Sequence, residues 1–435
     1  MNREIPLLVV LFSVGAGGLA RAQNTPPTPL TLKDAEALAL KNHPQVLAAQ
    51  ATVLEFNELV VEARSAYFPT IDGEVTGSGG NPQARIGAGF LPASRLFDRL
   101  GTGILLSQLI TDSGRTPNLV ASSRLQAQAS QQTYQATRYD VLLAVNQAYF
   151  GALRAQALVK VAQQTVAARQ ILSDQVTELA KNKLRSDVDV AFADVNLSEA
   201  KLLLLRSQDQ LRAAFAELTR ALGAQQEVSY KLADEPLPPS PPSDADSLVA
   251  QAFTNRPDLL SLQLQRDAAV KFARAERDLS FPTVSLVGAA GAIPEMKQIL
   301  STNVPDNYEG AALNVEVPIF NGHLFAARRE AARYRARAED QRVRDLQERI
   351  ARDVRVAWSS SRTAFQNIDV TAELLRESSL AMDLAQGRYN LGLSSIVELY
   401  QAELNITAAE IENLNAKYDY QSIYAMLQYT MGLLR

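Results

Sequence analysis

The chain has 435 residues, of which 47% are hydrophobic and 21% charged, values typical of a folded rather than a disordered protein. Its formal net charge is −4 and no basic stripe dominates, which argues against nucleic-acid binding. It contains no cysteine, and this excludes disulfides, thiolate catalysis, cysteine-based zinc sites and an N-terminal lipidated cysteine.

Residues 1–22 have the three parts of a secretory signal peptide. Arg3 precedes an uncharged run from Ile5 to Ala20, and the Ala-Arg-Ala at 20–22 matches a small-residue cleavage site. The run is sixteen residues long and includes three glycines, which is short for a transmembrane anchor. We therefore expect export, with Gln23 as the first residue of the mature chain.

The first half of the mature chain, residues 23–234, predicts a helix, two strands, a very long helix and a returning helix. Residues Ile71 to Thr76 alternate between apolar and polar after a Phe-Pro pair, and Gly101 to Thr111 is a noisier strand match. From Ala152 to Leu222 there is no Gly or Pro, and helix formers dominate. We expect one turn within this stretch, with Ser186 capping the returning helix.

The second half, residues 243–435, repeats this plan after a proline-rich linker at 235–242. Asn-x-Pro-x-x-Leu occurs at 42–47 and again at 255–260, an offset of 213. At an offset of 209, Asp189 matches Glu398 and Gly223 matches Gly432. A nearly constant register over this length indicates internal duplication. The stretch from His323 to Gln386, again without Gly or Pro, predicts the second long helix.

The residues do not favour an enzyme. The only histidines are His43, in the first Asn-x-Pro turn, and His323, and neither has a second ligand at metal-binding spacing. No phosphate-binding loop is present, so we expect no catalytic residue, metal or cofactor. A structural or adhesive coiled-coil surface protein is the remaining alternative. It would explain the helices but not the paired strands or the duplication.

Four short motifs lie at matching places in the two halves. The second half has Val317-Pro-Ile-Phe-Asn-Gly322 and Tyr389-x-x-Gly392-x-x-Ser395. The first half has Asp112-Ser-Gly114 and a turn at Lys183-Leu184 that lacks the usual glycine. In their order and spacing these motifs resemble the outer-membrane efflux protein family typified by TolC.

The resemblance implies a mixed α and β membrane protein. Three identical chains would share a β-barrel of twelve strands in the outer membrane, four from each chain, above a long antiparallel α-helical barrel in the periplasm. It further implies a passive exit channel of a tripartite efflux or type I secretion system. The partners would be a periplasmic adaptor protein, an inner-membrane pump and outer-membrane lipid.

Elementary physics supports a shared barrel, because four strands cannot close without leaving an unpaired edge in lipid. The alternation of the strands then assigns their faces. Asn314 and Glu316 are expected to face the lumen. The lipid-facing set is expected to include Val284, Leu286, Leu313, Val315 and Val317.

The resemblance places the functional groups at the two helix-turn tips. It implies a periplasmic gate made by Asp189, Glu398 and Tyr389, although both acids sit in the first turn of a helix, where they also stabilise the helix dipole. Ser394 and Gln401 stand where the best-known member of the family has a basic and an acidic residue. Arg185 or Arg388 would then supply the missing charge. Residues expected to contact the adaptor are Leu184, Ser186, Gly392, Leu393 and Ser395.

Overall fold

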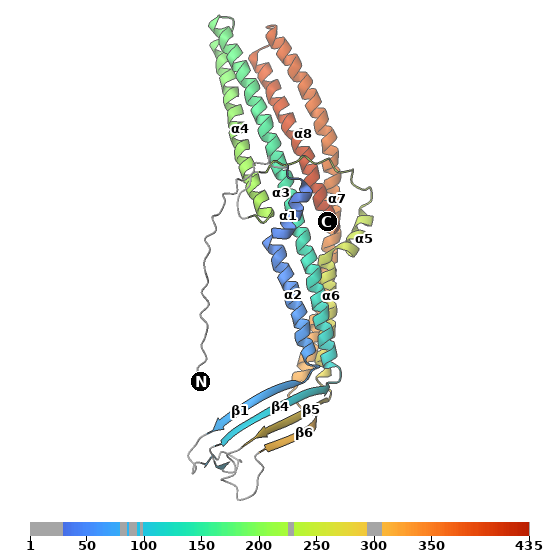
Figure 1. The fold of residues 1–435 in the computed structure, drawn as a ribbon. Helices are drawn as coiled ribbons and strands as arrows, with labels where there is room; N and C mark the ends of the chain where they lie inside the picture. The colour runs from blue at the N-terminus through green and yellow to red at the C-terminus, as the bar shows by residue number, and fades with distance from the viewer. Residues whose placement is uncertain are drawn as a thin grey trace, which may run out of the picture.

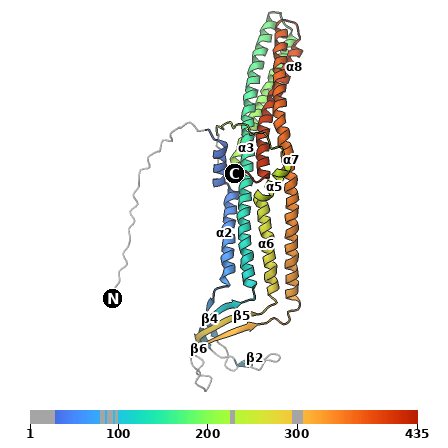
Figure 2. The same ribbon diagram turned by 90° about the vertical axis from the view of Figure 1, so that its right-hand side faces the viewer.

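The computed structural model describes residues 29–78, 85–86, 94–95, 99–224, 230–293 and 307–434. The expected signal peptide lies outside these residues. The described chain is mostly helical and elongated, with a β-sheet at one end and two helical hairpin tips at the other (Figures 1 and 2). None of the described helices contains a stretch long and apolar enough to cross a bilayer.

Each half contains two short helices, two strands of the main sheet, one very long helix and one returning helix. In the first half these are α1 (Leu32–Asn42), α2 (Pro44–Ser65), β1 (Thr70–Ser78), β4 (Arg99–Thr111), α3 (Arg115–Lys181) and α4 (Asp187–Ala221). In the second half they are α5 (Ala245–Asn255), α6 (Pro257–Asp278), β5 (Thr283–Ala292), β6 (Asn307–Glu316), α7 (Leu324–Asn390) and α8 (Ile396–Thr430). Corresponding helices have equal lengths of 11, 22, 67 and 35 residues.

The long helices α3 and α7 have 67 residues each and extend about 100 Å at 1.5 Å per residue. The glycine-free stretches of the sequence do not mark their ends, because α3 continues through Gly151 and α7 through Gly387. A Cβ added at either glycine would meet no atom within 4 Å. Each glycine costs about 1 kcal/mol in a helix interior, and packing along a helix of this length outweighs that cost.

The main sheet has the strand order β1-β4-β5-β6, and every neighbouring pair is antiparallel. Its register pairs Val284 with Val315, so these two side chains share a face, whereas Asn314 pairs with Ser285 on the opposite face. Leu286 and Leu313 are also paired, on the face of Val284. A second, two-stranded ribbon of β2 (Arg85–Ile86) and β3 (Ser94–Arg95) was not predicted from the sequence.

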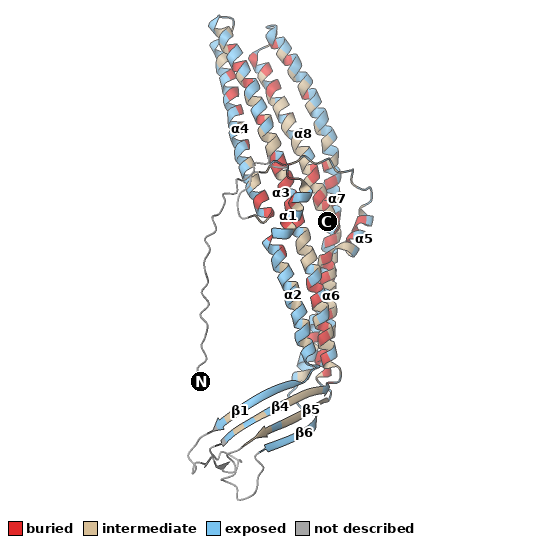
Figure 3. Cartoon of the chain, in the orientation of Figure 1, coloured by how far each residue is buried: buried red, intermediate tan, exposed pale blue. Residues whose placement is uncertain are grey.

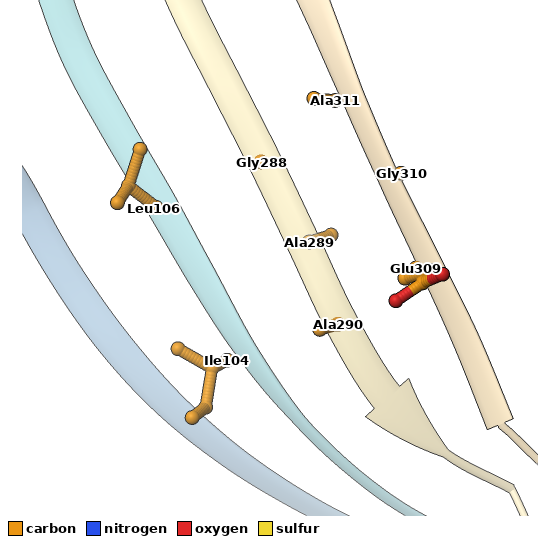
Figure 4. A pocket seen from close by; sticks show the side chains of 8 residues that line it. All are labelled: Ile104, Leu106, Gly288, Ala289, Ala290, Glu309, Gly310 and Ala311. Atoms are coloured by element: carbon orange, nitrogen blue, oxygen red, sulfur yellow. The ribbon is translucent and has the colours of Figure 1, made fainter.

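Among the described residues nothing covers the apolar face of the main sheet. Figure 3 shows much of β1 and β6 in the colour of exposed residues. Leu313 is 66% exposed and Val315 is 55% exposed. A shallow hollow lies on this face, with Ile104 and Leu106 of β4 along one side and Glu309 of β6 along the other (Figure 4). Its floor consists of small residues, namely Gly288, Ala289, Ala290, Gly310 and Ala311.

The two repeated sequence features of each half meet in space. Prolines begin α2 and α6, where a missing N–H costs nothing, and so each Asn-x-Pro breaks a helix. Gly223 and Gly432 follow α4 and α8 with left-handed φ angles of 68° and 70°. A Cβ on Gly223 would stand 2.7 Å from the Cα of His43, and one on Gly432 would stand 2.8 Å from the carbonyl carbon of Asn255. Close approach to the helix break therefore requires glycine in both halves.

Residues 230–242, which include the linker, lie against the long helices near their middle, and their carbonyl groups accept hydrogen bonds from side chains of these helices. The Tyr149 hydroxyl of α3 lies 2.7 Å from the Ala233 carbonyl oxygen and 2.8 Å from that of Leu30, a residue paired with this segment, and shares its proton between them. Trp358 of α7 donates to the Pro242 carbonyl at 2.7 Å. On α8, Tyr420 and Gln421 donate to the carbonyls of Pro239 and Glu235. We call residues 230–242 the strap, because they join helices of both halves.

Candidate functional site: the helix-turn tips

The two tips have the same backbone geometry. Lys183 and Gly392, which match at the offset of 209, adopt left-handed φ angles of 61° and 73°. The amide of Leu184 donates to the Leu179 carbonyl at 2.9 Å, and the amide of Leu393 donates to the Arg388 carbonyl at 2.8 Å. These bonds close the last turns of α3 and α7 as a glycine C-cap does. The first turn therefore forms without its usual glycine, because Lys183 adopts the left-handed backbone conformation despite the strain this causes in a residue with a Cβ.

The matched acids Asp189 and Glu398 make different contacts. Asp189 completes a capping box, because its Oδ2 accepts from the Ser186 amide at 3.2 Å while Ser186 Oγ accepts from the Val188 amide at 3.1 Å. Glu398 instead accepts from Arg388, with Oε1 3.0 Å from Nε. Both partners of this ion pair are about half exposed, so solvent screening keeps its contribution small.

Arg185 connects the two hairpins. Its guanidinium carbon lies 4.2 Å from the centre of the Tyr389 ring, and its Nη2 donates to the Tyr389 carbonyl at 2.9 Å. Tyr389 is buried, with 3% exposure, and among the described residues its hydroxyl has no hydrogen-bond partner. Burial raises the pKa of this hydroxyl, Arg185 opposes that shift, and Asp189 adds to it.

Below these contacts an apolar cluster fills the space between the hairpins. It includes residues of α3, α4, α7 and α8, namely Leu172, Val176, Ala193, Ala385, Tyr389, Ile396, Leu399 and Ala402. Beyond the cluster, the ends of both turns are open to solvent. Leu184 is 69% exposed and Leu393 is 68% exposed, and Ser186, Gly392 and Ser395 are exposed as well.

The arrangement thus brings the expected gate residues into two pairs, Arg185 with Tyr389 and Arg388 with Glu398. The charge of Asp189 adds to the raised pKa of the Tyr389 hydroxyl, but its carboxylate is held by its own helix cap. Ser394 does not join either pair, and its Oγ is buried without a hydrogen-bond partner in the part of the chain that the structure describes.

The chain matches the model of the family described as outer membrane efflux protein over residues 37–224 and 248–433. It belongs to the outer membrane efflux protein family. Membership makes it an outer-membrane efflux channel that extends into the periplasm. It also favours the channel over the adhesive coiled-coil alternative.

Named relatives of this outer membrane efflux protein are distant but cover most of the chain. It is 24% identical to the outer membrane efflux protein BepC of Brucella suis, over 92% of this chain and 85% of BepC. It is 21% identical to the outer membrane protein TolC of Escherichia coli, over 100% of this chain and 87% of TolC. Its fold is similar to that of the Campylobacter jejuni CmeC outer membrane channel, with a TM-score of 0.77 and 18% identity over 99% of this chain and 94% of CmeC.

Sequence reasoning missed one group of polar residues in this efflux protein. Arg169 of α3, Asn196 of α4 and Glu403 of α8 are buried together between the hairpins, on the strap side of the tips. Asn196 was visible only as a matched position of the repeat, since it aligns with Asn405. Arg169 is one of several arginines in a helix rich in Ala, Leu and Gln, and nothing in the sequence indicates that its side chain is the buried one.

Proposed function

We propose that three copies of this chain form one continuous duct, with a twelve-stranded β-barrel in the outer membrane and a helical barrel beneath it. The observation that carries the proposal is the main sheet itself. Its outer strands β1 and β6 each have one edge unpaired within the described chain, and its apolar face is uncovered. Lipid does not tolerate unpaired backbone groups, so further copies must supply the missing strands. The number three follows from the family resemblance.

The helical hairpins support the same assembly. Within one chain, α3 of the first hairpin packs on α8 of the second. The duplication would then pack α7 on α4 of a neighbouring copy. Apolar residues remain exposed on both of these helices, on α4 Val188, Phe192, Val195, Leu202 and Leu205, and on the tip half of α7 Val370, Leu374, Leu380 and Leu384. Their spacing of mostly three, four or seven residues is that of a helix–helix seam.

In this assembly the tips form the periplasmic gate. Arg185 on Tyr389 would hold the two hairpins of each chain together, and three copies of Glu398 would approach one another around the axis. A ring of acids favours cations in a pore. The duct needs no energy input, because an inner-membrane pump delivers the cargo through a periplasmic adaptor. The exposed Leu184 and Leu393 are the apolar side chains that such an adaptor would cover.

The test begins with the mature chain extracted from outer membranes in detergent. We expect a trimer by native mass measurement and discrete conductance steps in planar bilayers. A single-residue test of the barrel is Val315→Arg, which puts a charge on the apolar face and should reduce trimer recovery. A detergent-independent monomer in the periplasmic fraction, or trimers without conductance, would contradict the proposal.

A further inference from the structure

A buried ion contact between the hairpins is incomplete. Arg169 of α3 is 5% exposed in its side chain, and Glu403 of α8 is 11% exposed. Their atoms Nε and Oε2 are 3.9 Å apart, which is too long for a hydrogen bond. Both atoms are buried, and neither has a hydrogen-bond partner within the described residues. The guanidinium instead donates through Nη1 to the Asn196 carbonyl at 2.9 Å.

The other charged groups around Glu403 do not complete its hydrogen bonding. Glu199 of α4 lies 3.9 Å from Arg169 Nη1 and competes for the same cation, although it is about half exposed. Tyr400 of α8 donates its hydroxyl to Glu199 at 2.9 Å rather than to Glu403. From α7, the side chains packed in the adjoining apolar cluster are Met382, Ala385 and Tyr389. Tyr389 is the titratable one, and burial raises the pKa of its hydroxyl, so it stays neutral across the acid range.

The ionised form of the Glu403 carboxylate is energetically unfavourable in this position. Removing it from water costs several kcal/mol unless hydrogen bonds and a close counter-ion compensate. Glu403 has one counter-ion at 3.9 Å and one oxygen without a donor. Burial accordingly raises the pKa of Glu403, and Arg169 offsets that rise only in part.

We propose that Glu403 is a proton-sensitive positioning residue, whose protonation favours tight packing of the two hairpins and whose ionisation favours their separation. This inference rests on the proposed duct, in which separation of the hairpins widens the tip. It gives the chain a second control of the gate, distinct from the contacts at the turns.

The sign of the response follows from proton linkage. In the packed arrangement the pKa of Glu403 is raised, and in separated hairpins water would return it toward its ordinary value. The packed arrangement therefore binds the proton more tightly, and it is stabilised as the pH falls through the raised pKa. A simple salt bridge predicts the opposite, because protonation would remove its attraction and loosen the packing. The direction of the pH response separates the two mechanisms.

The experiment is single-channel recording of the full mature trimer between about pH 4 and about pH 8. We expect wild-type resting conductance to be severalfold lower at the acid end than at neutral pH. Glu403→Gln keeps the side-chain shape without the charge, so it should show the low conductance at every pH. Glu412→Gln is the matched control, because Glu412 lies exposed on the same helix, and it should keep the wild-type response.

A second variant tests the role of Arg169. Arg169→Met removes the one cation among the described residues that stabilises ionised Glu403, so the conductance change should move to higher pH. The inference is overturned if Glu403→Gln shows the wild-type pH response. It is also overturned if the conductance that depends on Glu403, taken as wild type minus Glu403→Gln, increases as the pH falls. Conducting trimers with either result refute this inference alone, whereas trimers that never conduct refute the proposed duct. If Arg169→Met does not assemble, the comparison of the two glutamate variants still decides.

Discussion

Replacing Arg185 with alanine should loosen the closed tip, and the size of the effect can be worked from its two contacts. The guanidinium lies 4.2 Å from the Tyr389 ring centre and donates to the Tyr389 carbonyl at 2.9 Å. Because Arg185 is partly exposed, we take values at the low end, about 0.5 kcal/mol for the cation–π contact and about 1.5 kcal/mol for the charged hydrogen bond. Their sum, about 2 kcal/mol per chain, shifts the closed-to-open ratio roughly thirtyfold.

The assay is resting conductance of single trimers in planar bilayers. Arg185→Ala should raise it strongly, and Arg185→Lys should give an intermediate value because ammonium keeps the charge but loses the flat stacking surface. Lys183→Gln removes one charge from the same exposed turn and is the control. The reasoning fails if Arg185→Ala trimers assemble normally with wild-type conductance. Equal effects from Arg185→Ala and Lys183→Gln would show that net charge at the turn matters, not the contact.

Three further outcomes are expected. Val315→Arg should lower the yield of assembled trimer far more than Glu316→Arg, because a charge in the lipid costs roughly 2–4 kcal/mol; equal yields would place both faces outside lipid. Gly432→Ala should lower the melting temperature, since a left-handed φ alone costs about 1–2 kcal/mol, whereas Gly387→Ala in open helix should be neutral or stabilising. Glu398→Ala should weaken cation selectivity and divalent block with trimer assembly unchanged, and unaltered selectivity would leave Glu398 as a helix-end charge only.

Most of the order of elements could be predicted from the sequence because its determinants are local. One helix was expected before the strands of each half, however, and the structure has two, separated at each Asn-x-Pro. Proline at a helix start, glycine in a left-handed turn and period-two alternation each act within a few residues. The offset of 209 between Gly223 and Gly432, shared with other matched pairs, therefore indicated the duplication before any contact was known. What the spacing did not reveal was the reason for these glycines, since the helix breaks they touch lie about 180 residues earlier in the chain.

The pairing of side chains at the tips could not be predicted, because it depends on how two hairpins meet. Arg185 and Arg388 were equal candidates for the missing charge in the sequence. In the structure only Arg185 reaches the other hairpin, while Arg388 stays on its own. Asp189 and Glu398 also diverge despite matching positions. The shorter acid reaches back to its own cap, and the longer one reaches the preceding helix.

The strap provides a point about which the helical hairpins of each chain can tilt. Hydrogen bonds from α3, α7 and α8 hold the strap near the middle of the long helices. From the level of the strap to the tips, the hairpins extend by most of the length of α4, which has 35 residues and spans about 52 Å. A tilt of about 5° at the strap would therefore displace the tip by about 4–5 Å, which is nearly the length of two water molecules in contact. In the proposed duct, a small change in packing at the level of the strap would therefore be amplified at the tips, while the sheet beyond the strap keeps its register.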